Sequence, residues 1–227
     1  MWWSGRGGMR NMLIVAGGVV AVAAIAVAVY SGTRPAAPPA GAPVASAPGG
    51  AAASLSVQAT DQVLGDPKAA VTIVEYASLT CSHCASFHNQ VLPDIKKKWI
   101  DTGKVKLVYR DFPLDRVALQ AAQIAECSGK ERYFAVLDIM FRGQAQWAVA
   151  QDAIGELSKS LRVAGIGDAE IKACLANDAI QTAVVAEGRA GEALGVSATP
   201  TIFINGERYS GPRSIEAIDT AIAKHVK

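Results

Sequence analysis

The sequence predicts an α/β fold in which a helical insertion splits the sheet, and three observations lead to this prediction. A β-branched, apolar run at Val71–Ala77 is followed by a helical apolar rhythm over Ala85–Trp99 and a second apolar run at Lys104–Arg110, which is the order of a β-α-β unit with parallel strands and a right-handed crossover. Residues 114–194 show only helical patterns. Strand-like residues return at Thr201–Ile204.

The N-terminal part contains a segment suited to a membrane. Residues 12–30 carry no charge, and at about 1.5 Å per residue they span roughly 28 Å, about one bilayer core. Arg6 and Arg10 precede the segment, so the positive-inside tendency leaves the remainder of the chain outside the inner membrane. The run is longer than a signal-peptide core. We therefore expect a retained anchor, with a cleaved signal peptide as the alternative.

The next stretch is rich in Pro, Ala and Gly and carries one charge, Arg34, before Gly50. Such a composition cannot bury enough apolar surface to fold. We expect residues 1–30 to be a cytoplasmic stub with its membrane segment and residues 31–57 a linker. Residues 58–113 and 195–227 would form the sheet domain, and residues 114–194 the helical insertion.

Several boundaries inside the folded part can be predicted. The first helix should kink near Pro93. Asp168 and Ser214 are expected to cap helices, and Asn205-Gly206 is expected to form a type I′ turn between Thr201–Ile204 and Glu207–Tyr209. The helices expected in the insertion are Val117–Cys127, Arg132–Phe141, Ala150–Leu161, Ala169–Leu175 and Ile180–Leu194, and a final helix ends near His225.

The motif Cys81-Ser82-His83-Cys84 lies between the first predicted strand and the first predicted helix. A thiol at a helix N-terminus faces unpaired backbone N–H groups and the positive end of the helix dipole, which favour the thiolate. We therefore expect Cys81 to be a nucleophile and Cys84, one turn later, its buried resolving partner. His83 can stabilise the thiolate by a hydrogen bond or by its charge; the alternative is a solvated loop histidine.

Metal and haem sites fit the motif less well. A zinc site needs four ligands, usually from two such pairs or from suitably spaced histidines, and Cys127, Cys174, His83 and His88 do not have that spacing. Attachment of c-type haem requires His where Ala85 stands. His88, one turn after Cys84, is expected on the helix surface. No metal or other cofactor is expected.

Three separated pieces of the sequence resemble the DsbA-like thiol–disulfide oxidoreductases of the thioredoxin superfamily. They are Gly65-Asp66-Pro67 with the strand and the cysteine motif that follow, the Ala-rich helical stretch, and Gly195-Val196-Ser197-Ala198-Thr199-Pro200-Thr201 with the strand after it. The resemblance covers about residues 58–227 and implies a thioredoxin-like fold with an inserted helical domain. The DsbA type best known from enteric bacteria has Pro and Val where this chain has Ser82 and Thr199.

The resemblance also implies roles for further residues. Glu75 stands where the superfamily keeps a buried acid that exchanges protons with the second cysteine; the alternative is a strand-end Glu that reaches solvent. Pro200 is expected to be cis. The backbone of Thr199 would pair with an extended substrate strand, a mode that reads main chain more than sequence.

Cys127 and Cys174 fall in the predicted insertion. An extracytoplasmic location permits disulfides, and a free thiol near an oxidising site risks mispairing. We expect these two residues to form a structural disulfide; two buried free cysteines are the alternative.

The expected function is that of an extracytoplasmic, periplasmic oxidase that donates its Cys81–Cys84 disulfide to reduced or unfolded exported proteins. A DsbB-like, quinone-coupled membrane oxidase would reoxidise it. The alternatives are a membrane-tethered reductase, for example in cytochrome c maturation, and a non-enzymatic peptide-binding or chaperone module. With 19% charged residues and a net charge of +2, the composition gives no basis for nucleic-acid binding.

Overall fold

A computed structural model describes residues 54–226 of the chain. The expected membrane segment, residues 12–30, and residues 31–53 of the expected linker lie outside this range. Within residues 54–226, none of the helices has both the length and the apolar character needed to cross a membrane.

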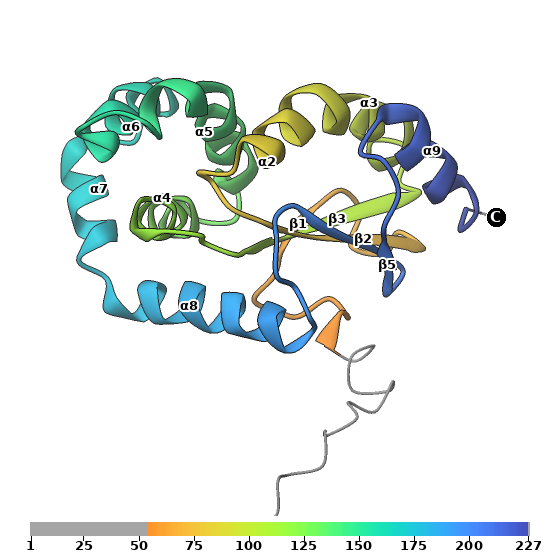
Figure 1. Cartoon of the computed structure of the whole chain (residues 1–227). Helices are drawn as coiled ribbons and strands as arrows, with labels where there is room; N and C mark the ends of the chain where they lie inside the picture. Colours follow the sequence, from red (N-terminus) through yellow and green to blue (C-terminus); the bar gives the residue numbers. More distant parts are fainter. Residues whose placement is uncertain (1–53, 227) are drawn as a thin grey trace, which may run out of the picture. The chain divides into compact units, whose positions relative to one another are not determined.

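The core of the fold is a five-stranded sheet in the order β1-β3-β2-β4-β5, in which only β2 and β3 run parallel (Figure 1). The strands are β1 Gln62–Leu64, β2 Val71–Ala77, β3 Val105–Asp111, β4 Thr201–Ile204 and β5 Glu207–Tyr209. The sequence predicts β2 and the β4–β5 hairpin at these bounds. β1 is not predicted, because three residues at a sheet edge are too few to show a period.

The β2–β3 connection is a helical segment with two wide turns. It comprises α2 Ser82–Ser86, a π-helical turn Phe87–Val91, α3 Leu92–Ile95 and a second π-helical turn Lys96–Ile100. The first wide turn ends two residues before Pro93, which lacks an N–H group and cannot continue the regular α-helical ladder. The interruption predicted near Pro93 therefore takes the form of a π-helical turn in place of a sharp kink.

Helices cover both faces of the sheet. Alternate residues of β2 enter different clusters: Ile73 packs with the helical segment and α9 Ile215–Ala223, whereas Tyr76 packs on the opposite face. Gly191 of α8 approaches the Tyr76 ring so closely that an added Cβ would lie 2.8 Å from it. α8 can therefore lie against the sheet only because this position has no side chain (Figure 1).

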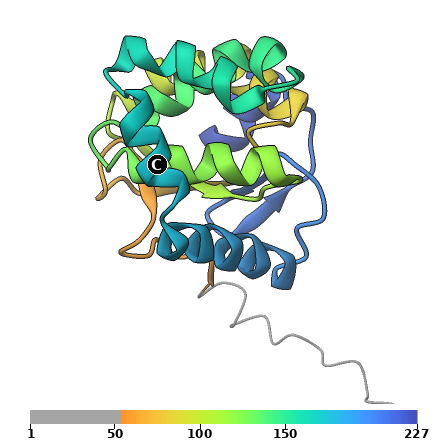
Figure 2. The same cartoon turned by 90° about the vertical axis from the view of Figure 1, so that its left-hand side faces the viewer.

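Five helices fill the interval between β3 and β4, and Figure 2 looks onto them. They are α4 Arg116–Cys127, α5 Tyr133–Trp147, α6 Ala153–Leu161, α7 Asp168–Leu175 and α8 Asp178–Ala193. Their apolar residues form one buried cluster that also contains Leu79 and Cys84. The insertion thus shares its core with the start of α2.

Two of the predicted caps can be compared with the structure. Ser214 caps α9 by accepting a hydrogen bond from the backbone N–H of Ala217, as predicted. Asp168 is not a cap: Gly167 occupies that position, and Asp168 is the first helical residue, where it accepts hydrogen bonds from Arg162. A carboxylate also suits the first turn because of the helix dipole. Asn205 and Gly206 both have positive φ, as a type I′ turn requires.

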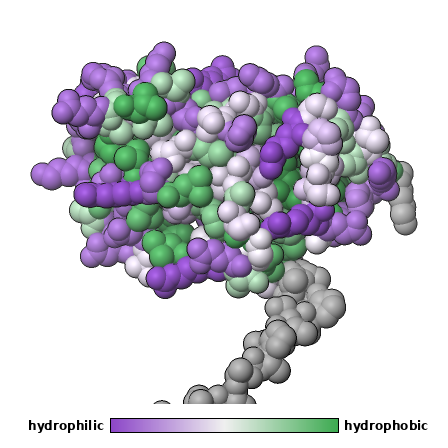
Figure 3. Space-filling model, viewed as in Figure 1, coloured by the Kyte–Doolittle hydropathy of each residue, from purple (hydrophilic) through white to green (hydrophobic). Residues whose placement is uncertain are grey.

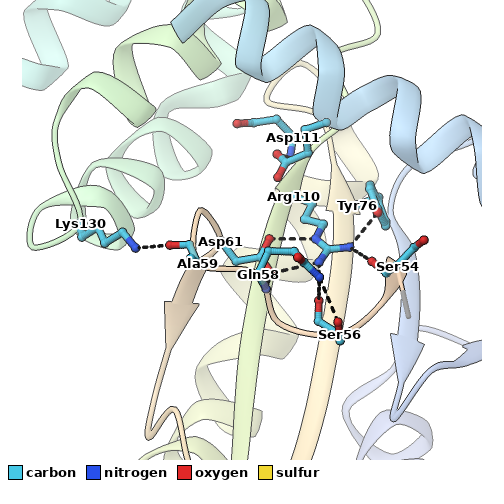
Figure 4. Close-up of polar contacts among 10 residues, drawn as sticks. Ser54, Ser56, Gln58, Ala59, Asp61, Tyr76, Arg110, Asp111 and Lys130 are labelled. Carbon is cyan, nitrogen blue, oxygen red and sulfur yellow. Dashed lines mark hydrogen bonds and ion pairs between the residues drawn. The ribbon is translucent and has the colours of Figure 1, made fainter. Parts of the chain in front are cut away.

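Arg110 of β3 is the centre of a buried polar cluster on the face of the sheet opposite α9 (Figure 4). Its guanidinium donates two 3.0 Å hydrogen bonds to the carboxylate of Asp61 and one to the hydroxyl of Tyr76. It also donates to the carbonyl oxygens of Ser54 and Ser56. Arg110 thereby ties the first described residues to the sheet.

A cavity of about 880 Å³ lies beside this cluster, between α8, the end of α4 and residues 54–62. Ile180 and Val184 line it on one side, and Arg110 and Glu126 on the other. Figure 3 shows hydrophobic surface between hydrophilic residues on the side where α8 lies. No residue of the cysteine motif lines this cavity.

Candidate active site

The two cysteines of the motif have different surroundings because of where α2 begins. Cys81 has an extended backbone (φ −81°, ψ 117°) at the cap position of α2 and is partly exposed. Cys84 lies inside the first turn and is fully buried. Both are free thiols in this structure.

The surroundings of Cys81 stabilise its thiolate. The pKa of Cys81 is lowered to about 5, and the largest cause is a hydrogen bond from the Cys84 thiol, which burial partly opposes. The side chain of Thr199 and the backbone N–H groups of Cys84 and His83 make smaller contributions in the same direction. A thiolate that accepts several hydrogen bonds is favoured over its thiol. At neutral pH Cys81 is therefore ionised.

The surroundings of Cys84 have the opposite effect. Burial raises the pKa of Cys84 far above the usual thiol range, and the hydrogen bond to Cys81 and the negative charge of Glu75 raise it further. Cys84 therefore stays protonated at neutral pH, so the order of acidity is the one predicted for a nucleophile and its resolving partner.

Glu75 is completely buried in β2, which agrees with the buried alternative of the two expected for it. A 2.9 Å hydrogen bond joins its Oε2 atom to Nε2 of His88, and its Oε1 atom has no hydrogen-bond partner within residues 54–226. The expectation that His88 lies on the helix surface is wrong, because only 8% of this residue is exposed. His88 follows the buried Cys84 by four residues and so lies on the same buried face of the helical segment.

His83 is exposed, and its side chain makes no hydrogen bond within the described part of the chain. Its backbone N–H, however, is one of the groups that lower the pKa of Cys81. The structure therefore shows a main-chain contribution of His83 at this site.

Thr199 and Pro200 lie beside the motif, and the peptide bond between them is cis, as the loop position predicts. Sγ of Cys81 donates a 3.4 Å hydrogen bond to the carbonyl oxygen of Thr199. The Thr199 hydroxyl is buried and has no hydrogen-bond partner among the described residues while Cys81 is a thiol. It can therefore donate to the thiolate once Cys81 ionises.

The helical insertion contacts the motif directly through Gln144 of α5, a residue that the sequence did not single out. Its buried amide donates hydrogen bonds of 2.9 Å and 2.8 Å to the carbonyl oxygens of Leu79 and Cys81. Thr80 also donates a 2.6 Å hydrogen bond to Asp115, the residue that caps α4. These contacts fix the loop that carries Cys81.

A disulfide joins Cys127 at the end of α4 to Cys174 in α7, with the Cα atoms 5.6 Å apart. It lies within the insertion and closes a sequence separation of 47 residues. Within residues 54–226, no three His, Cys, Asp or Glu side chains are grouped as a metal ion requires.

The sequence of this chain is similar to those of known proteins. A family model described as thioredoxin matches residues 57–224. A protein of Rickettsia conorii, provisionally named a protein-disulfide oxidoreductase, is 37% identical over 176 residues, which cover 75% of this chain and 62% of the relative. A protein of Rickettsia bellii with the same provisional name is 33% identical over 177 residues, covering 74% and 67%. The chain thus spans about three fifths of the length of the Rickettsia conorii relative.

Solved structures show the same architecture. α-DsbA1 of Wolbachia pipientis superposes with a TM-score of 0.72 at 31% sequence identity, covering 77% of this chain and 95% of that one. Oxidised BdbD of Bacillus subtilis gives a TM-score of 0.67 at 23% identity, covering 73% and 92%. The second likeness concerns the fold alone.

Proposed function

This chain belongs to the thioredoxin family and resembles its DsbA-like members, and from that membership we propose that it is a thiol–disulfide oxidoreductase that oxidises exported proteins. The observation that carries the proposal is the contrast between the two thiols. The surroundings lower the pKa of Cys81 to about 5 and raise that of Cys84. Stabilising one thiolate lowers the free energy of the reduced form and makes the disulfide more oxidising.

The reaction follows from this contrast. A client thiolate attacks Sγ of Cys81 in the Cys81–Cys84 disulfide, and the sulfur of Cys84 leaves as a thiolate and takes up a proton. A second client thiolate then attacks the client sulfur of the mixed disulfide, and Cys81 leaves as its stabilised thiolate. The client loses two electrons and gains a disulfide, while the enzyme gains two electrons. Cys81 is a good leaving group because its pKa is low.

Client recognition is proposed to use the loop before β4. Thr199 is next to Cys81 in space, and its carbonyl oxygen already accepts a hydrogen bond from that thiol. An extended client segment that pairs with the Thr199 backbone would bring its own sulfur to Cys81, by main-chain hydrogen bonds that tolerate many sequences. The proposed clients are reduced or unfolded exported proteins.

The proposed location is extracytoplasmic, with residues 12–30 as an anchor in the inner membrane. This part rests on the charge-free segment and the arginines before it. An enzyme that donates disulfides must be reoxidised after each cycle, and we assign this step to a DsbB-like, quinone-coupled membrane protein.

Two measurements test the proposed direction of the reaction. We expect the Cys81–Cys84 couple to have a reduction potential closer to about −120 mV, the value of DsbA, than to about −270 mV, the value of thioredoxin. A value near that of thioredoxin together with rapid insulin reduction would instead indicate a reductase. Absence of exchange with any thiol would indicate a binding or chaperone module.

Trapping identifies the clients and tests the two roles. In Cys84→Ala, Cys81 can still attack a client disulfide, but no nearby thiol resolves the product. We expect mixed disulfides with exported proteins on diagonal gels, and none in the matched Cys81→Ala variant. Adducts that persist in Cys81→Ala would reverse the two assignments.

A further inference from the structure

The buried Glu75 is hydrogen-bonded to His88, a side chain that is partly in contact with solvent. The Glu75 side chain has no exposed surface, and its Oε2 atom is 2.9 Å from Nε2 of His88. Its other oxygen, Oε1, has no hydrogen-bond partner within residues 54–226. Any proton that reaches the Glu75 carboxylate through hydrogen bonds of residues 54–226 must therefore pass through His88.

His88 is held in one orientation by aromatic rings. Its imidazole stacks on Phe141 of α5 with ring centroids 4.1 Å apart, and it meets Phe87 and Tyr109 edge to face. The packing keeps Nε2 aimed at Glu75, yet 6% of the His88 side chain remains exposed. The second ring nitrogen, Nδ1, makes no hydrogen bond within residues 54–226. One nitrogen is bound to the buried acid, and the other is available to water.

The redox reaction needs such a connection because Cys84 is buried and must gain and lose a proton in every cycle. Cys84 is fully buried, and the charge of Glu75 acts directly on it. The other titratable groups that face the pair are Cys81, which is ionised at neutral pH, and Tyr109. Burial keeps the pKa of Tyr109 well above its usual value, and its hydroxyl has no hydrogen-bond partner among residues 54–226. Neither group can supply Cys84 with a proton from solvent.

We propose that His88 is a positioning and proton-transfer residue that connects Glu75, and through it Cys84, with solvent. The inference rests on the proposed oxidoreductase function. When the disulfide is donated, the Cys84 thiolate takes a proton from the Glu75 carboxylic acid through a bridging water, because no direct hydrogen bond joins the two side chains. Glu75 then regains a proton from Nε2 of His88, and His88 binds one from water at Nδ1. During reoxidation the same proton travels in the reverse direction, so that no net proton is created or lost.

The test uses oxidised glutathione, whose reaction with the reduced full-length protein separates the two cysteines. Attack by Cys81 gives a mixed disulfide at a rate that rises with glutathione concentration. Deprotonation of Cys84 and its attack on the Cys81 sulfur then release the second glutathione thiolate, at a rate that no longer depends on concentration. The plateau rate at high glutathione therefore reports the step assigned to Glu75 and His88.

We expect His88→Gln, which retains a hydrogen-bond donor but cannot relay a proton, to lower the plateau rate at least about tenfold. The concentration-dependent phase should remain unchanged. His225→Gln, which alters the histidine near the C-terminus, is the matched control and should leave both phases as in the wild type. In His88→Ala, added imidazole should restore the plateau rate, a rescue that a purely structural role does not produce.

The outcomes separate this inference from the proposed function. A plateau rate and pH profile of His88→Gln equal to those of the wild type would overturn the role of His88 and leave the oxidoreductase intact. Loss of both phases in the wild type would instead refute the proposed function. If His88→Ala fails to fold by circular dichroism, the His88→Gln result decides alone.

Discussion

The carbonyl oxygen of Thr199 lies 3.4 Å from Sγ of Cys81, although 118 residues separate them in the sequence. Strand pairing between β2 and β4 produces this proximity, since the motif follows β2 and the Thr199 loop precedes β4. Thr199 also has its hydroxyl group near the thiol, and this hydroxyl lowers the pKa of Cys81.

Replacing Thr199 by Val should therefore raise the pKa of Cys81 and make the disulfide less oxidising, because the thiolate loses one donor. The absorbance of the thiolate at 240 nm, followed against pH, measures the shift. Thr201→Val is the matched control, since that hydroxyl donates to the carbonyl oxygen of Ala198 and not to the thiol. Equal pKa values in Thr199→Val and the wild type would rule out this contribution.

Alkylation of the reduced protein should show one reactive thiol. We expect the iodoacetamide reaction rate of Cys81 to rise through a midpoint near pH 5, because its pKa is lowered to about 5. Cys84 should not react in the folded protein, since it is buried. Peptide mapping after a short pulse at each pH assigns the label. A midpoint near the ordinary thiol value of about 8.5 would argue against an activated Cys81.

The disulfide between Cys127 and Cys174 should stabilise the insertion without taking part in exchange. Replacing both residues by Ser avoids a free thiol, and the loop length gives a loss of about 4 kcal/mol in the chain-entropy model. Urea denaturation of the oxidised wild type and the double variant measures this difference. The glutathione kinetics of the variant should match those of the wild type, and an altered rate at Cys81 would show that the bridge influences the motif.

Glu187 of α8 predicts a loss of stability toward alkaline pH. Its carboxylate accepts a 2.6 Å hydrogen bond from the backbone N–H of Asp111, but burial raises its pKa to about 8. The folded state therefore holds a proton that the unfolded chain, with a pKa of 4.5, loses earlier. Stability from this group is complete below pH 4.5 and declines as pH rises to about 8.

Glu187→Gln should remove this decline, because the amide stays neutral and can still accept the hydrogen bond from Asp111. Urea denaturation at several values between pH 5 and pH 9 should show the variant gaining stability over the wild type as pH rises. Glu192→Gln, on the exposed side of the same helix, serves as the control and should follow the wild type. A constant difference between Glu187→Gln and the wild type across this range would contradict the assignment.

The elements that the sequence predicts well are those with a strong local signal. β2 is a continuous apolar, β-branched run, and the β4–β5 hairpin is marked by Asn205-Gly206, so both follow from neighbouring residues alone. The boundaries of the insertion helices differ by a few residues, as at α5, which continues from Phe141 to Trp147. Helix ends depend on tertiary packing and caps, and a periodic pattern does not determine them.

The features of the site that the sequence did not reveal depend on contacts between distant segments. His88 looks like a surface residue because of its polarity, but its spacing from Cys84 and the acid in the neighbouring strand together place it inside. Gln144 and Arg110 carry no local signal either. Each acts by bonding the main chain of a segment far away in the sequence, which no short pattern records.

The two hydrogen bonds from Gln144 to the carbonyl oxygens of Leu79 and Cys81 have a mechanical consequence. If the insertion rotated away from the sheet as a rigid lid, the Leu79 carbonyl would lose its hydrogen bond, at a cost of roughly 1–3 kcal/mol if it stays buried. The Cys81 carbonyl would keep only its hydrogen bond from the backbone N–H of Ala85. The same rotation would also shift the loop backbone that holds the nucleophile, because Gln144 bonds it directly. Hinge bending at this boundary would therefore disturb the reactive sulfur itself, and a docking client meets a preformed surface to which it must adapt its own shape.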